Sequence, residues 1–421
     1  MPRVALHTLG CKVNQYETQK IAEEFAAKGF EIVDFAEVAE VYVINTCTVT
    51  QVADSKSRQA ARAAFRRNPD AAIFLTGCYA ETSAADAARI EGVAEIIGNT
   101  EKSLLVDRAV SFLGISESVR PAEHANVKSP GTRTRALLKI QDGCDQFCTY
   151  CAVPLARPVM TSKPMYEVIS EARTLADKGF TEIVLTGIRL GRYMDGTANL
   201  CDLMESLSEI EGIERIRLSS IEVTDIPPGL VELLAENRKI CRHLHIPLQC
   251  GDDEVLKRMN RPYDLGEFEE FAHRVRREVP EIGITTDIMV GFPGETDEHF
   301  ERSYAAVERL QFSRAHVFKY SIRPGTVAAQ FTDQLLSEIK DARSARLVEL
   351  TKKHESAFAA GLVGRKVAVL VEGKEVKPNL RSGLTDNYVR VQVDAGSDQV
   401  GKIVDVRIDS TSGGIARGHI E

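Results

Sequence analysis

The segment that decides the fold of this chain reads Gly143-Cys144-Asp145-Gln146-Phe147-Cys148-Thr149-Tyr150-Cys151. It directly follows an apolar run at residues 136–141 that has the composition of a strand. Its three cysteines have the spacing C-x-x-x-C-x-x-C. Three thiolates on one such loop reach three irons of a single cubane cluster and leave the fourth iron without a protein ligand. An open iron of this kind is a place where a cofactor can bind.

Zinc is the alternative metal for this loop. A structural zinc site usually takes four protein ligands and pairs of cysteines at C-x-x-C spacing. No second cysteine pair lies near residues 144–151 in the sequence. The spacing therefore favours an iron–sulfur cluster.

Around this loop, strand and helix patterns alternate from residue 136 to about residue 331. The strand candidates are residues 136–141, 182–186, 215–221, 243–248, 283–290 and 316–320. Six β-α units are too few for an eight-stranded barrel, but they predict an open partial (β/α)6 barrel whose working face lies at the strand C-termini. Polar residues and glycines at those ends are candidates for cofactor binding: Thr186, Gly187, Glu222, Gln249 and Gly291.

The N-terminal region also alternates strands, at residues 4–8, 41–44, 72–76 and 95–97, with helices, which predicts an open parallel sheet with flanking helices. Cys11, Cys47 and Cys78 each follow one of the first three strands. Strand C-termini form the ligand-binding crevice of such a sheet, so these thiols are predicted to converge on a second cluster. The alternative is that they are small buried side chains. No G-x-G-x-x-G loop follows the first strand, which argues against a dinucleotide-binding reductase.

The domain organisation follows from these patterns. We expect an N-terminal domain at residues 1–114, a linker rich in Ser, Pro and Gly at 115–134, and the barrel at 135–360. A small antiparallel β-barrel is predicted at 361–421, with strands near 366–372, 387–393 and 401–408.

Composition indicates a cytoplasmic protein. The chain has 421 residues, of which 43% are hydrophobic and 27% charged, and it contains neither a run of about 18 apolar residues nor a signal-peptide core. No membrane association is expected. An odd count of nine cysteines argues against a disulfide scaffold. Cys201 and Cys241 are interpreted as structural, and Cys250 as structural or as part of the lining of the barrel mouth.

The formal charge of −8 is unevenly distributed. Residues 55–69 contain five bases and no acid, and Arg58, Arg62 and Arg66 share one helical face. Residues 128–139 contain Lys128, Arg133, Arg135 and Lys139 and no acid, and the tail from residue 361 has a net charge of +1. These stretches can bind phosphates or can be solvated surfaces. Tyr388 is a candidate platform for stacking an RNA base.

The Cys144–Cys151 loop resembles the cluster motif of the radical S-adenosylmethionine (SAM) superfamily. The resemblance implies that the open iron chelates the amino and carboxylate groups of SAM, and that an electron cleaves SAM to a 5'-deoxyadenosyl radical. Cys144, Cys148 and Cys151 are then the catalytic cluster ligands, and Tyr150 joins the strand-end residues as a cofactor contact.

Three further segments resemble the N-terminal domain of methylthiotransferases: Thr8-Leu9-Gly10-Cys11-Lys12-Val13-Asn14-Gln15-Tyr16-Glu17, Asn45-Thr46-Cys47-Thr48-Val49-Thr50 and Thr76-Gly77-Cys78-Tyr79-Ala80. The resemblance extends over nearly the whole chain, includes an RNA-binding TRAM barrel, and is strongest to the enzymes acting on N6-threonylcarbamoyladenosine at position 37 of tRNA, beside the anticodon. It implies radical insertion of sulfur and transfer of a methyl group to give the 2-methylthio nucleoside. The implied cofactors are two 4Fe-4S clusters, at Cys144, Cys148 and Cys151 and at Cys11, Cys47 and Cys78, together with SAM.

The same resemblance implies as partners a tRNA anticodon stem-loop and an electron donor such as a flavodoxin or ferredoxin, with the enzyme itself monomeric. Departures from the family pattern at Pro158, Arg189 and Met194 bear on substrate fit. Alternative substrates are isopentenyladenosine in tRNA and a ribosomal-protein aspartate. An alternative of another class is a zinc-stabilised RNA-binding protein without catalysis.

Overall fold

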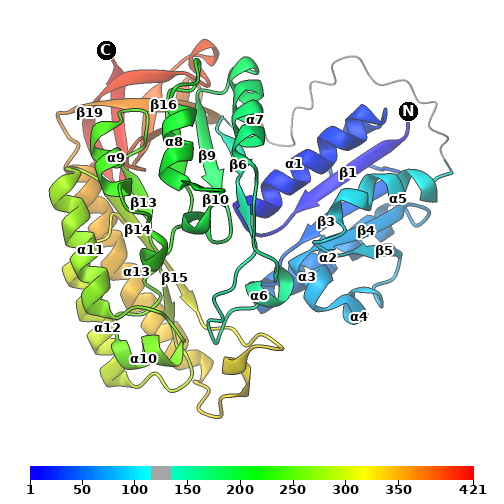
Figure 1. Ribbon diagram of the computed structural model, residues 1–421, viewed down its shortest axis with the longest axis horizontal. Coiled ribbons are helices and arrows are strands. Elements are labelled where there is room, and N and C mark those ends of the chain that lie inside the picture. The colour runs from blue at the N-terminus through cyan, green and yellow to red at the C-terminus, as the bar shows by residue number, and fades with distance from the viewer. Residues whose placement is uncertain (115–133) are drawn as a thin grey trace. The chain divides into compact units, whose positions relative to one another are not determined.

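The computed structural model describes residues 1–114 and 134–421, which form two compact units (Figure 1). The first contains residues 1–114 and the short segments Gly143–Met160 and Ser321–Ala329. The second contains residues 134–142, Thr161–Tyr320 and Gln330–Glu421. The predicted linker lies outside the described residues except for Thr134. Both predicted cluster motifs therefore belong to the first unit.

The first unit is built on a parallel sheet with the order β2-β1-β3-β4-β5. Its strands are β1 (Arg3–Thr8), β2 (Glu31–Val33), β3 (Val41–Thr46), β4 (Ala72–Gly77) and β5 (Val93–Ile97). The open parallel sheet is confirmed, with β2 as an additional edge strand. Every residue of β3 and β4 is buried, as expected of central parallel strands covered on both faces.

Helices cover both faces of this sheet. Helices α1 (Lys12–Ala27) and α5 (Leu105–Phe112) pack with Val43 and Phe74 on one face. Helices α2 (Gln51–Arg67), α3 (Cys78–Thr82) and α4 (Ala84–Ala87) lie over Ile44 and Leu75 on the other. Adjacent residues of one strand thus enter opposite cores, because side chains alternate across a sheet. The 3-10 helix η1 (Lys102–Leu104) precedes α5, and α6 (Val153–Ala156) also belongs to this unit.

The second unit contains the predicted partial barrel. Its six parallel strands are β6 (Ala136–Lys139), β9 (Glu182–Thr186), β12 (Arg215–Leu218), β13 (His243–His245), β14 (Gly283–Val290) and β15 (Arg314–Lys319). They form sheets ordered β12-β9-β6 and β13-β14-β15, and parallel bridges from Ile216 to Ile240 and from Ser220 to His245 connect the two. The strands therefore succeed one another in chain order, and the open (β/α)6 arrangement is confirmed.

Helices follow the strands along the chain. They are α7 (Met165–Asp177), α8 (Leu200–Ser208), α9 (Leu230–Glu236), α10 (Asp253–Arg258), α11 (Leu265–Glu278), α12 (Asp297–Leu310) and α13 (Ser337–Ala360). Capping boxes at Asn199, Asp264 and Thr296 begin α8, α11 and α12. Two short antiparallel pairs complete the unit, β7 (Gln141–Asp142) with β8 (Thr161–Ser162) and β10 (Met194–Asp195) with β11 (Ala198–Asn199). No helix in residues 1–114 and 134–421 is long and apolar enough to cross a membrane.

The tail forms a closed barrel ordered β16-β17-β18-β20-β19. Its strands are β16 (Lys366–Lys377), β17 (Leu380–Thr385), β18 (Arg390–Asp394), β19 (Ile403–Ser412) and β20 (Ile415–Ile420). The pairs are antiparallel except β18 with β20, which is parallel. A closed ring of five strands cannot alternate direction all the way round, so one parallel pair is unavoidable. The predicted barrel is thus confirmed, but β17, β20 and the parallel pairing of β18 with β20 were not predicted from sequence.

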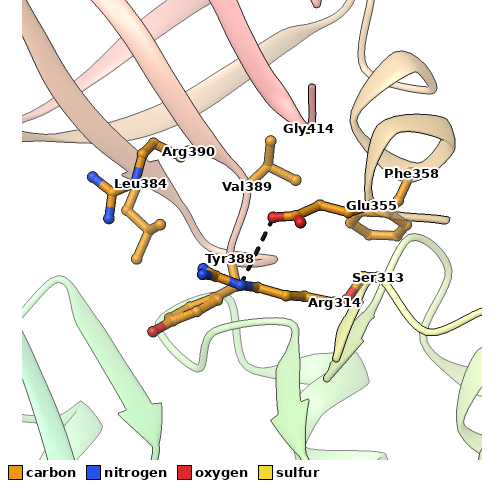
Figure 2. Close-up of a pocket in the computed structure, with 9 residues that line it drawn as sticks. All are labelled: Ser313, Arg314, Glu355, Phe358, Leu384, Tyr388, Val389, Arg390 and Gly414. Atoms are coloured by element: carbon orange, nitrogen blue, oxygen red, sulfur yellow. Dashed lines mark ion pairs between the residues drawn. The ribbon is translucent and has the colours of Figure 1, made fainter. Parts of the chain in front are cut away.

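Two arginines of β12 attach the tail barrel to the partial barrel. The Arg215 guanidinium donates to the Leu384 carbonyl at 3.1 Å, and that of Arg217 to the Asp386 carbonyl at 2.8 Å. Beside this seam lies a small cleft, shown in Figure 2, in which Arg314 and Glu355 form an ion pair at 3.7 Å. These contacts satisfy polar groups at the seam and show that both barrels belong to one unit.

Candidate active site

Cys11, Cys47 and Cys78 lie at the carboxyl edge of the first sheet. Cys11 is the N-cap of α1, Cys47 directly follows β3, and Cys78 is the first residue of α3, after β4. Cys47 and Cys78 are buried, whereas Cys11 is exposed. The predicted placement at three strand ends is therefore confirmed, and each thiol enters the site from a different loop.

Glycine allows these loops to approach one another. Gly10 has a φ of 97°, and a Cβ atom there would lie 2.8 Å from Cys47 Sγ. Gly77 has a φ of 92°, and its Cβ atom would lie 2.4 Å from the Thr46 carbonyl oxygen. Both positions need the left-handed conformation that glycine adopts without strain. Any side chain at Gly10 would displace the Cys47 thiol.

Asn14 joins two of the three cysteine loops. Its side-chain nitrogen donates to the carbonyl oxygen of Leu9, two residues before Cys11, at 2.8 Å and to that of Thr46, directly before Cys47, at 2.9 Å. Its side-chain oxygen lies 3.9 Å from Cys11 Sγ. The amide is buried and therefore fixes the distance between the two loops.

The three thiols influence one another electrostatically. Burial, together with smaller contributions from Cys78 and Cys11, raises the pKa of Cys47 to about 11. Burial also raises the pKa of Cys78, whereas the charge of Arg157 and a hydrogen bond from it lower that pKa. Thiolates are the form that binds metal, so a cation must compensate the burial of both sulfurs. This thiol set therefore fits a metal centre, which would supply that charge.

Within the described part of the chain, no three His, Cys, Asp or Glu side chains are arranged to hold a single metal ion. A multi-iron cluster does not require that arrangement, since each cysteine binds a different iron.

The second cysteine loop, Gly143–Cys151, is held by backbone hydrogen bonds. The Cys144 amide donates to the Arg157 carbonyl at 3.1 Å, and the Cys151 amide to that of Cys148 at 3.0 Å. Amides also point at sulfur: that of Gln146 lies 3.4 Å from Cys144 Sγ, and that of Val153 lies 3.4 Å from Cys151 Sγ. Amide donors of this kind favour the thiolate and tune an iron–sulfur cluster. Tyr150 lies within this loop, between Cys148 and Cys151, and is partly buried.

The strand-end residues predicted to bind the cofactor lie at one edge of the partial barrel. Thr186 is the last residue of β9, and Gly291 directly follows β14. A Cβ atom on Gly187 would lie 3.0 Å from the Gln141 side chain, and one on Gly291 would lie 2.3 Å from Lys340 Cγ. At both glycines another side chain therefore packs directly against the backbone, which leaves no room for a side chain at that position.

Gln249 and Ser219 have the strongest structural signs of a ligand site. Gln249 has a φ of 64°, a conformation that costs energy in a residue with a side chain and that is often found at functional sites. Its buried Oε1 atom and the buried Ser219 hydroxyl have no hydrogen-bond partner in residues 1–114 and 134–421. Buried polar atoms normally have partners, so the strand ends of β12 and β13 fit a polar cofactor such as SAM.

Glu222 is engaged by an arginine. The Arg261 guanidinium forms an ion pair with its carboxylate, and Arg261 Nε donates to the Tyr263 hydroxyl at 3.1 Å. The carboxylate is thereby held in one orientation at the strand end.

Other sequence expectations change. Tyr388 lies in the turn between β17 and β18, not on a strand, with a φ of 74°, and one face of its ring stacks on His243 at 4.3 Å between ring centroids. Figure 2 shows Tyr388 beside the seam between the barrels.

Cys250 is 1% exposed and contacts the Ser303 hydroxyl, which makes it structural. Arg189 forms a buried two-bond ion pair with Asp225.

The basic stretches have different environments. Arg62 and Arg66 are exposed on α2, whereas Arg58 lies over the Tyr79 ring. Arg135 pairs with Glu372 and Lys139 with Asp142. Lys128 and Arg133 lie outside the described residues. The α2 face is therefore the more accessible basic surface of the two.

Comparison with known proteins agrees with this fold. Residues 138–307 match the Radical SAM superfamily, 3–98 the Uncharacterized protein family UPF0004, and 361–420 the TRAM domain. A radical S-adenosylmethionine methyltransferase, TsrM from Kitasatospora setae, superposes with a TM-score of 0.59 at 17% identity over 78% of this chain and 77% of that one. The barrel and the cysteine loop therefore define a radical SAM enzyme, a class that implies a 4Fe-4S cluster and SAM.

Relatives in sequence define the family more closely. The chain is 42% identical to the threonylcarbamoyladenosine tRNA methylthiotransferase MtaB of Bacillus subtilis, over 97% of this chain and 94% of that protein. It is 38% identical to the MtaB of Aquifex aeolicus, over 96% and 100%. It is 32% identical to the tRNA-2-methylthio-N(6)-dimethylallyladenosine synthase of Methylacidiphilum infernorum, over 98% and 93%. The chain belongs to the radical SAM tRNA methylthiotransferase family.

Proposed function

We propose that this enzyme converts N6-threonylcarbamoyladenosine at position 37 of tRNA to its 2-methylthio form. The observation that carries the proposal is the pair of three-cysteine motifs within one compact unit, Cys11, Cys47 and Cys78 on three strand-end loops and Cys144, Cys148 and Cys151 on one. The higher identity to the named threonylcarbamoyladenosine enzymes, 42% against 32% for a dimethylallyladenosine enzyme, supports this nucleoside.

Each part of the chain has a proposed role. Residues 1–114 carry the ligands of the auxiliary cluster, residues 135–360 form the radical SAM core, and residues 361–421 bind RNA. Cys144, Cys148 and Cys151 hold a 4Fe-4S cluster, and Cys11, Cys47 and Cys78 hold the second. Thr186, Gly187, Glu222, Gln249 and Gly291, with Tyr150, orient SAM.

When bound, the clusters and SAM supply the radical that removes hydrogen from carbon 2, the sulfur and the methyl group. The chain's own residues bind and orient these groups and exclude water. Buried Cys47 and Cys78 keep two ligand sulfurs away from solvent. The base must be unstacked to react, which suits a nucleoside in the anticodon loop. We further propose that the enzyme is a cytoplasmic monomer reduced by a flavodoxin or ferredoxin.

Nucleoside mass spectrometry tests the substrate. A strain lacking this gene should lose the 2-methylthio form of threonylcarbamoyladenosine, and the wild-type gene should restore it. Cys11→Ala and Cys144→Ala should not restore it, because each removes a ligand of one cluster. Loss of methylthiolated dimethylallyladenosine, or of methylthiolated aspartate in a ribosomal protein, would assign the enzyme to that substrate instead. A colourless, zinc-loaded protein would support the non-catalytic alternative.

A further inference from the structure

Arg157 is buried beside the cysteines at the edge of the first sheet, and 2% of its side chain is exposed. Its terminal nitrogens donate to both carboxylate oxygens of Glu17, at 2.8 and 2.9 Å, and one also donates to Asn14 Oδ1 at 3.1 Å. Lys102 donates to the same carboxylate. Two basic side chains therefore share one buried acid. Burial lowers the pKa of Lys102, whereas a guanidinium stays charged at any pH the protein experiences.

This buried network reaches the sulfurs of the sheet edge. The charge of Arg157 and a hydrogen bond from its side chain lower the pKa of the Cys78 thiol, which places the guanidinium beside that sulfur. Through Asn14 the network also reaches Cys11, whose Sγ lies 3.9 Å from Asn14 Oδ1, and the Thr46 carbonyl that precedes Cys47. A single buried cation is thus connected to all three predicted ligand loops.

The main chain of Arg157 contacts the other cysteine motif. Its carbonyl accepts the Cys144 amide at 3.1 Å, and the adjacent Ala156 carbonyl accepts the Asn99 side chain at 2.8 Å. Asn99 Oδ1 in turn accepts from Lys102 at 2.9 Å. Both cysteine motifs are therefore tied to the same residue, one through its side chain and one through its backbone.

We propose that Arg157 is a positioning residue for the auxiliary cluster, which holds the Cys78 ligand and places a fixed positive charge beside it. The inference rests on the proposed function, since it requires a cluster at Cys11, Cys47 and Cys78. Reduction adds an electron to a cluster, so nearby positive charge and N–H donors to sulfur favour the reduced state and raise the reduction potential. Arg157 raises this potential, and the carboxylate of Glu17 lowers it.

The test isolates the auxiliary cluster in a Cys144→Ala, Cys148→Ala, Cys151→Ala parent. Iron and sulfide in this anaerobically purified parent should correspond to one cluster. If the parent binds no iron, the proposed function is overturned and this inference with it. If it binds iron, a redox titration followed by electron paramagnetic resonance tests the inference separately.

In this parent, Arg157→Gln should shift the potential downward and Glu17→Gln upward, while Arg157→Lys should recover most of the lost potential. Arg67→Gln is the matched control, because it removes the same charge at the far end of α2, about 24 Å along the helix from its start. It should leave the potential unchanged. Opposite shifts are not expected of two substitutions that merely loosen the structure.

Shifts in the same direction for Arg157→Gln and Glu17→Gln, or no shift in either, would overturn the inference. If Arg157→Gln fails to retain iron, the reduction potential of the Glu17→Gln variant decides whether the inference holds. A reduction potential in Glu17→Gln that is equal to or lower than that of the parent would then contradict the inference.

Discussion

The guanidinium of Arg157 lies against the carboxylate of Glu17 in a two-bond ion pair, although the two residues are 140 positions apart in the chain. Their side chains are 2% and 9% exposed. Helix α1, which carries Glu17, begins directly after Cys11, and Arg157 follows the Cys144–Cys151 loop. The pair therefore fastens one predicted cluster loop to the helix that starts at the other.

Glu17→Ala should destabilise the protein strongly. Removing one partner of a buried ion pair leaves the other charge buried and uncompensated, which costs about 3–5 kcal/mol. Urea unfolding of metal-free protein should show this loss in the free energy of unfolding. Glu23→Ala on the same helix is the control, because Glu23 pairs with Lys20 at a partly exposed site, where such pairs contribute up to about 1 kcal/mol. Equal losses in the two variants would contradict the structural importance of the Arg157 pair.

Gly10→Ala should abolish the auxiliary cluster while the protein stays folded. The added Cβ atom would lie 2.8 Å from Cys47 Sγ, so the ligand must move. Gly179→Ala has a similar left-handed backbone, with a φ of 85°, but no atom within 4 Å of its Cβ position. The Gly179→Ala substitution should lower the free energy of unfolding by about 1 kcal/mol and leave the iron content unchanged. Iron and sulfide measurements distinguish the two, and full iron in Gly10→Ala would refute this prediction.

Arg62→Gln combined with Arg66→Gln should weaken tRNA binding and flatten its salt dependence. Both side chains are exposed on α2, and neither pairs with a carboxylate in the described part of the chain. Each lost phosphate contact should reduce the slope of log affinity against log salt by about 0.7–0.9. The control removes two exposed arginines that do pair with acids, Arg274 and Arg309. An unchanged slope in the α2 double variant would show that this face does not contact tRNA.

Gln249→Gly should lower SAM affinity by about tenfold without loss of stability. Losing one hydrogen bond costs about 1–1.5 kcal/mol of binding, whereas glycine relieves the left-handed backbone of Gln249, whose φ is 64°. Gln311→Gly relieves a similar backbone, with a φ of 44°, at the end of α12 and should leave SAM affinity unchanged. Equilibrium binding of SAM to the reconstituted enzyme is the measurement. Undiminished affinity in Gln249→Gly would remove Gln249 from the cofactor site.

Local patterns predicted the architecture well, because strand and helix periodicities are properties of short segments. The sheet of the first unit, the six strands of the partial barrel and the antiparallel character of the tail barrel follow from them, whereas β17 and β20 of the tail barrel were missed. The short edge strand Glu31–Val33 was missed, since three residues carry no recognisable alternation. The parallel pairing of β18 with β20 was missed because it follows from closure of the whole ring.

The candidate site was predictable only where topology alone brings residues together. Cys11, Cys47 and Cys78 each end a parallel strand, and parallel strands end at one edge. The polar network of Asn14, Glu17, Lys102 and Arg157 has no such signal, because its members come from segments far apart in sequence. Tyr388 was expected on a strand, whereas it lies in a turn and tertiary packing stacks one face of its ring on His243, a contact that local sequence does not reveal.

Iron and sulfide quantification on anaerobically purified protein shows whether the chain carries two separate clusters. Wild type should contain about eight irons and eight sulfides, the content of two 4Fe-4S clusters. Cys11→Ala and Cys144→Ala should each fall to about half, because each loses one ligand of a different cluster. Undiminished iron in Cys11→Ala, or zinc in place of iron in the wild type, would show that the enzyme does not hold two such clusters.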